Sequence, residues 1–127
     1  MRAIAIHEYG GPEVLELMDL PDPTAGPDVV VVRAKAAGVN PADFKIRKGR
    51  MDTRYPCHFP LVPGWDLAGV VEAVGPAVPE FSPGDEVLGY VRRDHIQWGT
   101  YAELVPAPVR TLARKPPGLS WAQAAAL

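Results

Sequence analysis

The chain has 127 residues, of which 47% are hydrophobic and 22% are charged, and this composition predicts one globular domain. Its net charge of −2 gives no reason to expect nucleic acid or an anionic membrane as a partner, and its single cysteine, Cys57, excludes an intrachain disulfide. No apolar run approaches the ~20 residues of a membrane-spanning helix, and Glu8 interrupts any signal-peptide core, so we expect a cytoplasmic protein.

Prolines and glycines separate many short apolar runs along the chain. The 15 prolines and 12 glycines are spread between these runs, which is typical of an all-β sandwich or barrel. Strands are expected, in chain order, over residues 3–7, 14–20, 29–36, 63–75, 86–91, 100–105 and 109–114. The first two are expected to form a hairpin, and the valine run at 29–36 predicts a strand that leaves a buried region for a half-exposed one. Gly69 indicates a bulge or a close backbone approach within the strand at 63–75.

Residues 38–49 contain the most complete local signal in the chain. Asn40 is a good N-cap residue, and Pro41 fits the first helical position, where its missing N–H is not needed. Asp43 adds a negative charge that the helix dipole favours in the first turn, and Gly49 can adopt the left-handed conformation that ends a helix. These residues predict one short helix directly after the strand at 29–36.

Two polar stretches interrupt the pattern of strands. The segment at 50–62 is long and has no regular pattern, which is typical of a functional loop that borders a site. Residues 92–98 form a second polar segment between strands. Residues 82–85 fit a tight turn. Near the end of the chain, Ser120 and Gln123 match a capping box and predict the start of a helix. Because so short a helix is marginal by itself, we expect the chain to be the front part of a longer protein.

Taken in order, these features resemble the N-terminal GroES-like domain of the medium-chain dehydrogenase/reductase superfamily, and more narrowly its zinc-independent, quinone-oxidoreductase-like members. The resemblance covers residues 1–127. It rests on Gly10-Gly11-Pro12, the run from Gly38 to Asp43 that leads to Arg47-Lys48-Gly49, the strand at 63–75, Pro83-Gly84-Asp85, and Gly99-Thr100-Tyr101-Ala102-Glu103. It implies a mainly β fold, a partly open GroES-like β-barrel with a few short helices.

The resemblance also implies a reaction for the complete enzyme, namely hydride transfer from NADPH to a quinone, an enone or another carbonyl compound. No Gly-x-Gly-x-x-Gly follows a strand in this chain, so the turn that would hold the pyrophosphate is missing. NADP(H) is therefore expected to be bound mainly by a nucleotide-binding domain that is absent from residues 1–127. The chain alone is expected to be inactive.

The positions of the zinc ligands carry other residues here. In zinc-dependent members of the superfamily a cysteine follows the Gly-Val pair, and Gly-His-Glu opens the later strand. Asn40 and Trp65 occupy these positions, and neither side chain can act as a thiolate or imidazole ligand. We expect no metal site, because the remaining candidate ligands follow no metal-binding pattern. These are Cys57, His7, His58 and His95.

The resemblance implies roles for five residues. Asn40 would lie near the nicotinamide ring and the substrate carbonyl, as a catalytic and cofactor-binding residue, and Asp43 would fix the catalytic site through hydrogen bonds. Arg47, one turn later, is expected to pair with Asp43 and support the site. Lys45 stands where related quinone reductases often have a tyrosine, which favours a different carbonyl or alkene substrate, and Tyr55 could line the substrate cleft. A helix cap for Asn40, a first-turn acid for Asp43 and a surface position for Tyr55 stay open as alternatives.

Other functions also stay open. The chain could be a non-enzymatic β-barrel module that binds a partner or associates with itself, and a GroES-type co-chaperonin fits the Asn40 helix less well. Trp65 and Asp66 are expected to serve packing and turn formation. Without a covering domain, Trp121 and residues 124–127 would expose apolar surface, so we expect a homo-oligomer with the C-terminal segment at the contact. The expected ligand of the complete enzyme is a small-molecule substrate.

Overall fold

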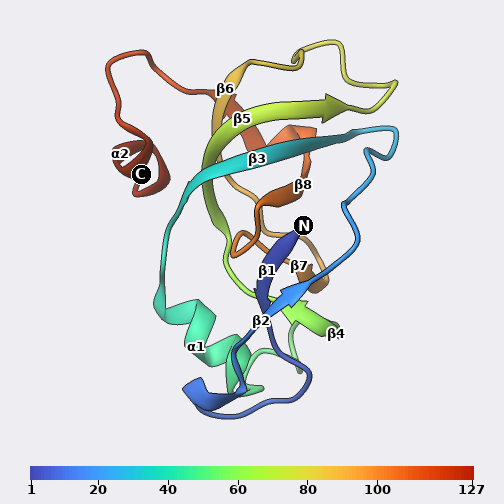
Figure 1. The fold of residues 1–127 in the computed structure, drawn as a ribbon, viewed down its shortest axis with the longest axis vertical. Helices are drawn as coiled ribbons and strands as arrows, with labels where there is room; N and C mark the ends of the chain where they lie inside the picture. Colours follow the sequence, from blue (N-terminus) through green and yellow to red (C-terminus); the bar gives the residue numbers. More distant parts are fainter.

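The computed structural model describes residues 1–127, and short β-strands make up most of its regular structure (Figure 1). The strands are β1 (Arg2–Ala5), β2 (Glu16–Asp19), β3 (Val29–Ala37), β4 (Cys57–Val62), β5 (Asp66–Val74), β6 (Glu86–Tyr90), β7 (Ile96–Trp98), β8 (Leu104–Pro108) and β9 (Leu112–Arg114). The helices are α1 (Pro41–Arg47) and α2 (Trp121–Ala125), with 3-10 turns η1 (Pro12–Val14) and η2 (Val109–Thr111). Neither helix has the length and apolar character needed to cross a bilayer.

Three separate sheets form the framework. Five antiparallel strands lie in the order β8-β3-β5-β6-β9, and two small sheets pair β1 with β2 and β4 with β7. Single bridges, Ala3 to Ala102 and Ile6 to Leu61, join β1 and the residue after it to the neighbouring segments. No continuous ladder of hydrogen bonds closes the sheets into a barrel. The predicted mainly β, partly open fold is confirmed.

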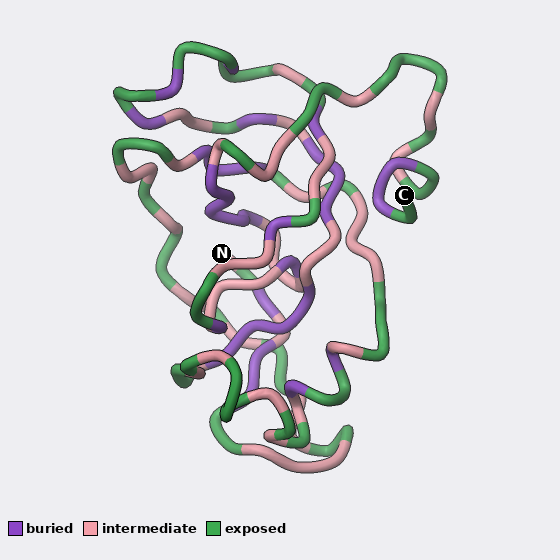
Figure 2. Tube along the Cα trace, turned by 180° about the vertical axis from the view of Figure 1, so that it is seen from behind, coloured by how far each residue is buried: buried purple, intermediate pink, exposed green.

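The valine run of β3 fixes the main core. Val30 and Val32 are fully buried and pack with Leu67, Val87 and Val105 of the same sheet. Figure 2 shows the buried segments, in purple, mainly in the middle of the molecule. Beyond them β3 reaches the surface, where Arg33 forms a 3.0 Å ion pair with Glu72. The predicted passage of this strand from a buried to a half-exposed region is therefore confirmed.

Gly69 lies where β3 and β5 approach each other closely. A Cβ atom at this position would clash with the backbone carbonyl oxygen of Arg33, and the register between the two strands shifts between Ala34 and Ala36. The close backbone approach expected from Gly69 is confirmed. Only a residue without a side chain fits here while the ladder stays intact.

Parts of the two polar stretches form strands, which the sequence analysis missed. Residues 57–62 are β4 rather than loop, and Ile96–Trp98, within the second polar segment, is β7, its parallel partner. The expected strands at 100–105 and 109–114 are also displaced. The first begins only at Leu104, and η2 takes up the start of the second. Short parallel pairing depends on a distant partner segment, so the local residue pattern did not show it.

The C-terminal helix packs against its own domain. Ser120 Oγ accepts a bond from Gln123 N at 3.1 Å and Gln123 Oε1 accepts from Ser120 N at 2.9 Å, which confirms the capping box. Ala124 and Ala125 are only 3% and 5% exposed because they pack with Ala68 of β5. The expectation that residues 124–127 expose apolar surface was therefore wrong for Ala124 and Ala125, whereas Leu127 is 78% exposed.

Candidate active site

Helix α1 lies beyond the end of β3, at one end of the molecule (Figure 1). Asn40 has an extended backbone just before the helix, and its N–H donates to Asp43 Oδ2 at 2.9 Å. At the other end Gly49 has a φ of +79°, so the predicted helix stop is confirmed. The carboxylate of Asp43 thus holds the first turn of α1 to the residue directly before the helix.

Asp43 is the only buried carboxylate of the chain, and Tyr101 is its second partner. The side chain of Asp43 is 6% exposed, and its Oδ2 accepts the Tyr101 hydroxyl proton at 2.7 Å. Burial, and next the hydrogen bond and negative charge of Asp43, raise the pKa of the Tyr101 phenol well above its ordinary value. Asp43 Oδ1 is buried without a hydrogen-bond partner, so this carboxylate depends on Tyr101 and Asn40.

A close contact between two loops places the Tyr101 ring. The N–H of Thr100 donates to Gly64 O at 3.0 Å, and the N–H of Tyr101 donates to Pro63 O at 3.1 Å. Gly64 has a φ of +98°, and a Cβ atom there would lie 2.6 Å from the Tyr101 ring. Gly64 therefore supplies both the left-handed backbone and the space that the phenol needs to reach Asp43.

The side chain of Asn40 is held by Asp66, the first residue of β5. Asn40 Nδ2 donates to Asp66 Oδ2 at 2.6 Å, and this acceptor fixes which end of the amide carries the hydrogens. Because the amide nitrogen has two hydrogens, one N–H stays free. Asn40 is solvent-exposed, so a ligand can reach this N–H.

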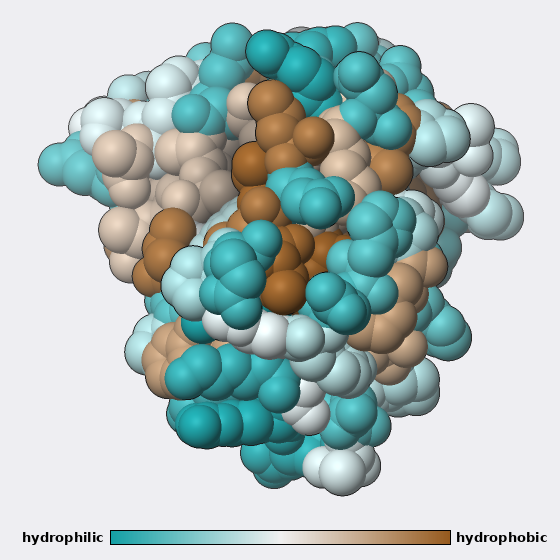
Figure 3. All heavy atoms as spheres, turned by 60° about the horizontal axis from the view of Figure 1, so that its bottom comes forward, coloured by the Kyte–Doolittle hydropathy of each residue, from teal (hydrophilic) through white to brown (hydrophobic).

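Asn40 and Asp43 border a hollow of about 330 Å³ on this end of the molecule. Its lining consists of Leu15, Val39, Asn40, Asp43, Phe44, Arg47, Pro63 and Tyr101. In Figure 3, which brings this end forward, apolar residues gather near the middle of the face and polar side chains border them. An apolar hollow with a few fixed polar groups is typical of a small-molecule site.

Arg47 does not pair with Asp43, so that expectation was wrong. Its Nε donates instead to Gly10 O at 3.2 Å, and the N–H of Gly10 donates to Arg47 O at 3.0 Å. Gly10, in the β1–β2 connection, offers a backbone acceptor to the guanidinium, whereas Asp43 Oδ2 accepts from the Tyr101 hydroxyl and from the N–H of Asn40. Arg47 supports the hollow by holding the Gly10 turn against α1.

Lys45 and Tyr55 lie outside the hollow. Lys45 is exposed on α1. Tyr55 contacts Trp65 edge to face, with ring centroids 6.2 Å apart, and the guanidinium of Arg92 lies 4.9 Å from the Tyr55 ring centroid. The structure brings Asn40, Asp43 and Arg47 together, and a substrate contact for Lys45 or Tyr55 stays a prediction.

Two members of the hydrogen-bond network, Asp66 and Tyr101, were not identified from the sequence. The sequence pattern predicts only turn formation for Asp66. Tyr101 belongs to the run Gly99-Thr100-Tyr101-Ala102-Glu103, which supports the family resemblance but indicates no role for the tyrosine itself. One signal was available for Asp66: it faces Gly38, where a Cβ atom would lie 2.8 Å from Asp66 Cβ. Gly38, two residues before Asn40, thus marks the place where β5 approaches this segment closely.

The candidate metal ligands do not gather into a site. No cluster of three or more His, Cys, Asp or Glu side chains is arranged to hold a metal ion. The rings of His58 and His95 lie 6.1 Å apart, and burial raises the pKa of the Cys57 thiol, which disfavours the thiolate that binds metals. Zinc independence stays a prediction.

The profile of the alcohol dehydrogenase GroES-like domain matches residues 26–117. The chain is 41% identical over 128 residues to the quinone oxidoreductase of Mus musculus, and 39% identical over 133 residues to the chloroplastic NADPH-dependent alkenal/one oxidoreductase of Arabidopsis thaliana. All of this chain aligns in both cases, but it spans only 37% and 34% of those proteins.

A solved structure shows the same fold. The Escherichia coli quinone oxidoreductase in complex with NADPH superimposes with a TM-score of 0.84 and 29% identity. The alignment covers 99% of this chain and 36% of that protein. The present chain therefore spans about one third of the length of the proteins that it matches.

Proposed function

Since the chain belongs to the alcohol dehydrogenase GroES-like domain family, we propose that it forms the substrate side of an NADPH-dependent reductase of quinones, enones or related carbonyl compounds. The chain is homologous to the N-terminal third of NADPH-dependent quinone and alkenal oxidoreductases. The activity belongs to those proteins, and its extension to this chain rests on the hollow beside α1.

The free N–H of Asn40 is the observation that carries the proposal. Asp66 occupies one hydrogen of the Asn40 amide at 2.6 Å and holds the group at the mouth of an apolar hollow. The other hydrogen can donate to a carbonyl oxygen as negative charge develops on it. Val39 and Phe44 would bind the apolar part of the same substrate.

The cofactor fits this chain at one end only. The amide of Asn40 suits the carboxamide of a nicotinamide ring, but no glycine-rich turn in residues 1–127 suits the pyrophosphate. NADPH supplies the hydride when bound. The residues of this chain orient the acceptor, donate a hydrogen bond to its oxygen and cover it with apolar side chains.

Titration of the isotope-labelled 127-residue chain with duroquinone tests the substrate site. This quinone has no free ring position, so Cys57 cannot add to it. We expect saturable shifts of the amide signals of Val39, Asn40 and Phe44, and binding about three- to tenfold weaker in Asn40→Ala, because one neutral hydrogen bond is lost. The exposed Thr53→Ala serves as the control and should bind like the parent chain.

A chimera tests the reaction itself. Residues 1–127 replace the matching segment of the mouse quinone oxidoreductase, and NADPH oxidation is followed with duroquinone as acceptor. We expect turnover, and a kcat/KM at least about tenfold lower in Asn40→Ala. A chimera that folds and binds NADPH but neither reduces duroquinone nor binds it at the hollow would contradict the proposal.

A further inference from the structure

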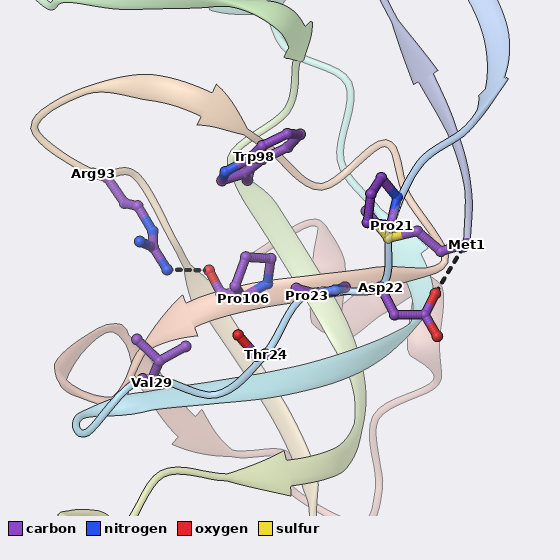
Figure 4. Close-up of a pocket in the computed structure, with 10 residues that line it drawn as sticks. Met1, Pro21, Asp22, Pro23, Thr24, Val29, Arg93, Trp98 and Pro106 are labelled. Carbon is purple, nitrogen blue, oxygen red and sulfur yellow. Dashed lines mark hydrogen bonds and ion pairs between the residues drawn. The ribbon is translucent and has the colours of Figure 1, made fainter.

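A second cavity lies away from α1, between the β2–β3 connection and the β6–β7 segment (Figure 4). Its volume is about 460 Å³, and it shares no lining residue with the hollow beside Asn40. Pro21, Pro23 and Pro106 form much of its wall together with the half-buried Trp98. The size and the largely apolar wall are typical of a small-molecule pocket.

The N-terminus holds one end of this cavity. The ammonium group of Met1 donates to Leu20 O at 2.8 Å and forms a 2.7 Å ion pair with Asp22 Oδ1. These contacts fix the Pro21–Pro23 wall. They also compensate the carboxylate of Asp22, which is the only acidic side chain in the lining.

Arg93 lies at the opposite end and has no such compensation. Its Nη2 donates to Pro106 O at 2.6 Å, but no carboxylate lies within ion-pair distance, and its buried Nε has no hydrogen-bond partner. Burial lowers the pKa of the guanidinium, an effect that Asp28 partly opposes and Arg110 reinforces. A partly buried cation with unused donors is unfavourable until an anion pairs with it.

Figure 4 shows Arg93 and Asp22 at opposite ends of the cavity, with Trp98 along the wall between them. An anion that enters can therefore reach the guanidinium while it stays away from the one carboxylate. The planar fork of arginine matches a carboxylate, and the indole and proline rings match a flat apolar group.

We propose that this cavity is a second binding site, which takes a small organic acid with its carboxylate on Arg93 and an aromatic or similarly flat apolar body against Trp98 and the prolines. The site shares no residue with the hollow beside α1. A failure of this proposal would therefore not affect the proposed reductase function, and the reverse also holds.

Phenylacetate is the probe, and phenylacetamide, which has the same shape without the charge, is the control ligand. In titrations of the labelled 127-residue chain we expect phenylacetate to shift the indole N–H signal of Trp98 saturably. Phenylacetamide should bind at least about tenfold more weakly, because it cannot form the charge-assisted bond. The resonances of Asn40 and Phe44 should not move.

Variants locate the carboxylate. We expect Arg93→Gln to weaken phenylacetate binding by about tenfold or more. The matched control is Arg92→Gln, because Arg92 is the neighbouring residue, lies over the Tyr55 ring and does not line the cavity. This control should bind phenylacetate as the parent does.

Three results would overturn the proposal: no saturable shift of Trp98, equal affinity for the acid and the amide, or undiminished binding in Arg93→Gln. The comparison of acid with amide uses the unmodified chain, so it decides the matter even where Arg93→Gln does not fold.

Discussion

At the scale of single residues, the Tyr101 hydroxyl and the Asp43 carboxylate depend on each other. Removal of the hydroxyl in Tyr101→Phe leaves a buried carboxylate with one partner fewer. We expect the free energy of unfolding to fall by about 1–3 kcal/mol, measured by urea denaturation. Tyr90→Phe is the control, because the Tyr90 hydroxyl makes no hydrogen bond within the protein and the residue is 55% exposed. Equal losses in the two variants would show that Asp43 does not need the phenol.

Alkaline pH should lower the free energy of unfolding by deprotonating partly buried phenols, of which Tyr101 is one. The folded state raises the pKa of Tyr101 above its ordinary value of 10.0, and burial raises that of Tyr9 to about 12. The protonated phenols are therefore favoured in the folded state, and their contribution is complete below pH 10 and is lost as the pH rises through the folded pKa values. We expect the free energy of unfolding to decline above about pH 10, and to decline less steeply in Tyr101→Phe. Urea titrations between pH 8 and 12 measure both slopes, and parallel slopes would contradict the expectation.

The site could be predicted only where its residues are neighbours in the chain. Asn40 and Asp43 were found because one helical turn contains both of them, together with its proline and glycine signals. Asp66 and Tyr101 lie 26 and 58 residues from the groups that they bind, and nothing local to either residue indicates that partner. Arg47 shows the opposite error: helical spacing predicted a pair with Asp43, but a backbone carbonyl from another segment binds the guanidinium.

At the scale of elements, the contact between β3 and β5 depends on Gly69. In Gly69→Ala the new methyl group would meet the Arg33 carbonyl, which belongs to a paired strand and has little freedom to move. We expect a loss of about 1–3 kcal/mol in the free energy of unfolding, as for other overpacked cores. Gly118→Ala is the matched control, since no atom lies within 4 Å of a Cβ atom there. A Gly69→Ala chain as stable as this control would mean that the strands can separate without cost.

The elements that could be predicted were those whose own residues determine their structure. Neighbouring residues determine three such features, and the sequence predicted each of them. They are the valine run of β3, the turn at 82–85 and the caps of both helices. β4 and β7 have no clear alternation of apolar and polar residues. β4 pairs with β7 and also bridges Ile6 through Leu61. These partners are distant in the chain, so the local sequence of either strand indicates a loop.

At the scale of the whole molecule, we expect no useful affinity of the isolated chain for NADPH. The Asn40 end offers contacts to the nicotinamide only, and the pyrophosphate has no glycine-rich turn to bind. Titration with NADPH, followed by its fluorescence, should show no saturation in the micromolar range. Micromolar binding would mean that this chain holds the phosphates by another route.

We also expect the chain to associate in solution. Val39 and Phe44 are 81% and 39% exposed beside the hollow, and Leu127 is 78% exposed at the C-terminus. Exposed apolar patches tend to find partners. Light scattering over a concentration series should show a mass above that of the monomer, and a constant monomer mass would contradict this. Val39→Asp and Leu127→Asp then show which end makes the contact, because only the variant at the interface should lower the mass.

The position of β3 between β5 and β8 has a consequence for the order in which the chain is made. During translation, residues 29–37 of β3 emerge from the ribosome long before residues 104–108 of β8. Only β8 completes the hydrogen bonds along the second edge of β3. During that interval the nascent strand presents unpaired backbone groups and a row of valines, the combination that favours pairing with other chains. We therefore expect the soluble yield to depend on how fast the ribosome translates the codons between Val74 and Leu104, and on the chaperones present during that interval. These factors should affect the yield more than the stability of the finished domain does.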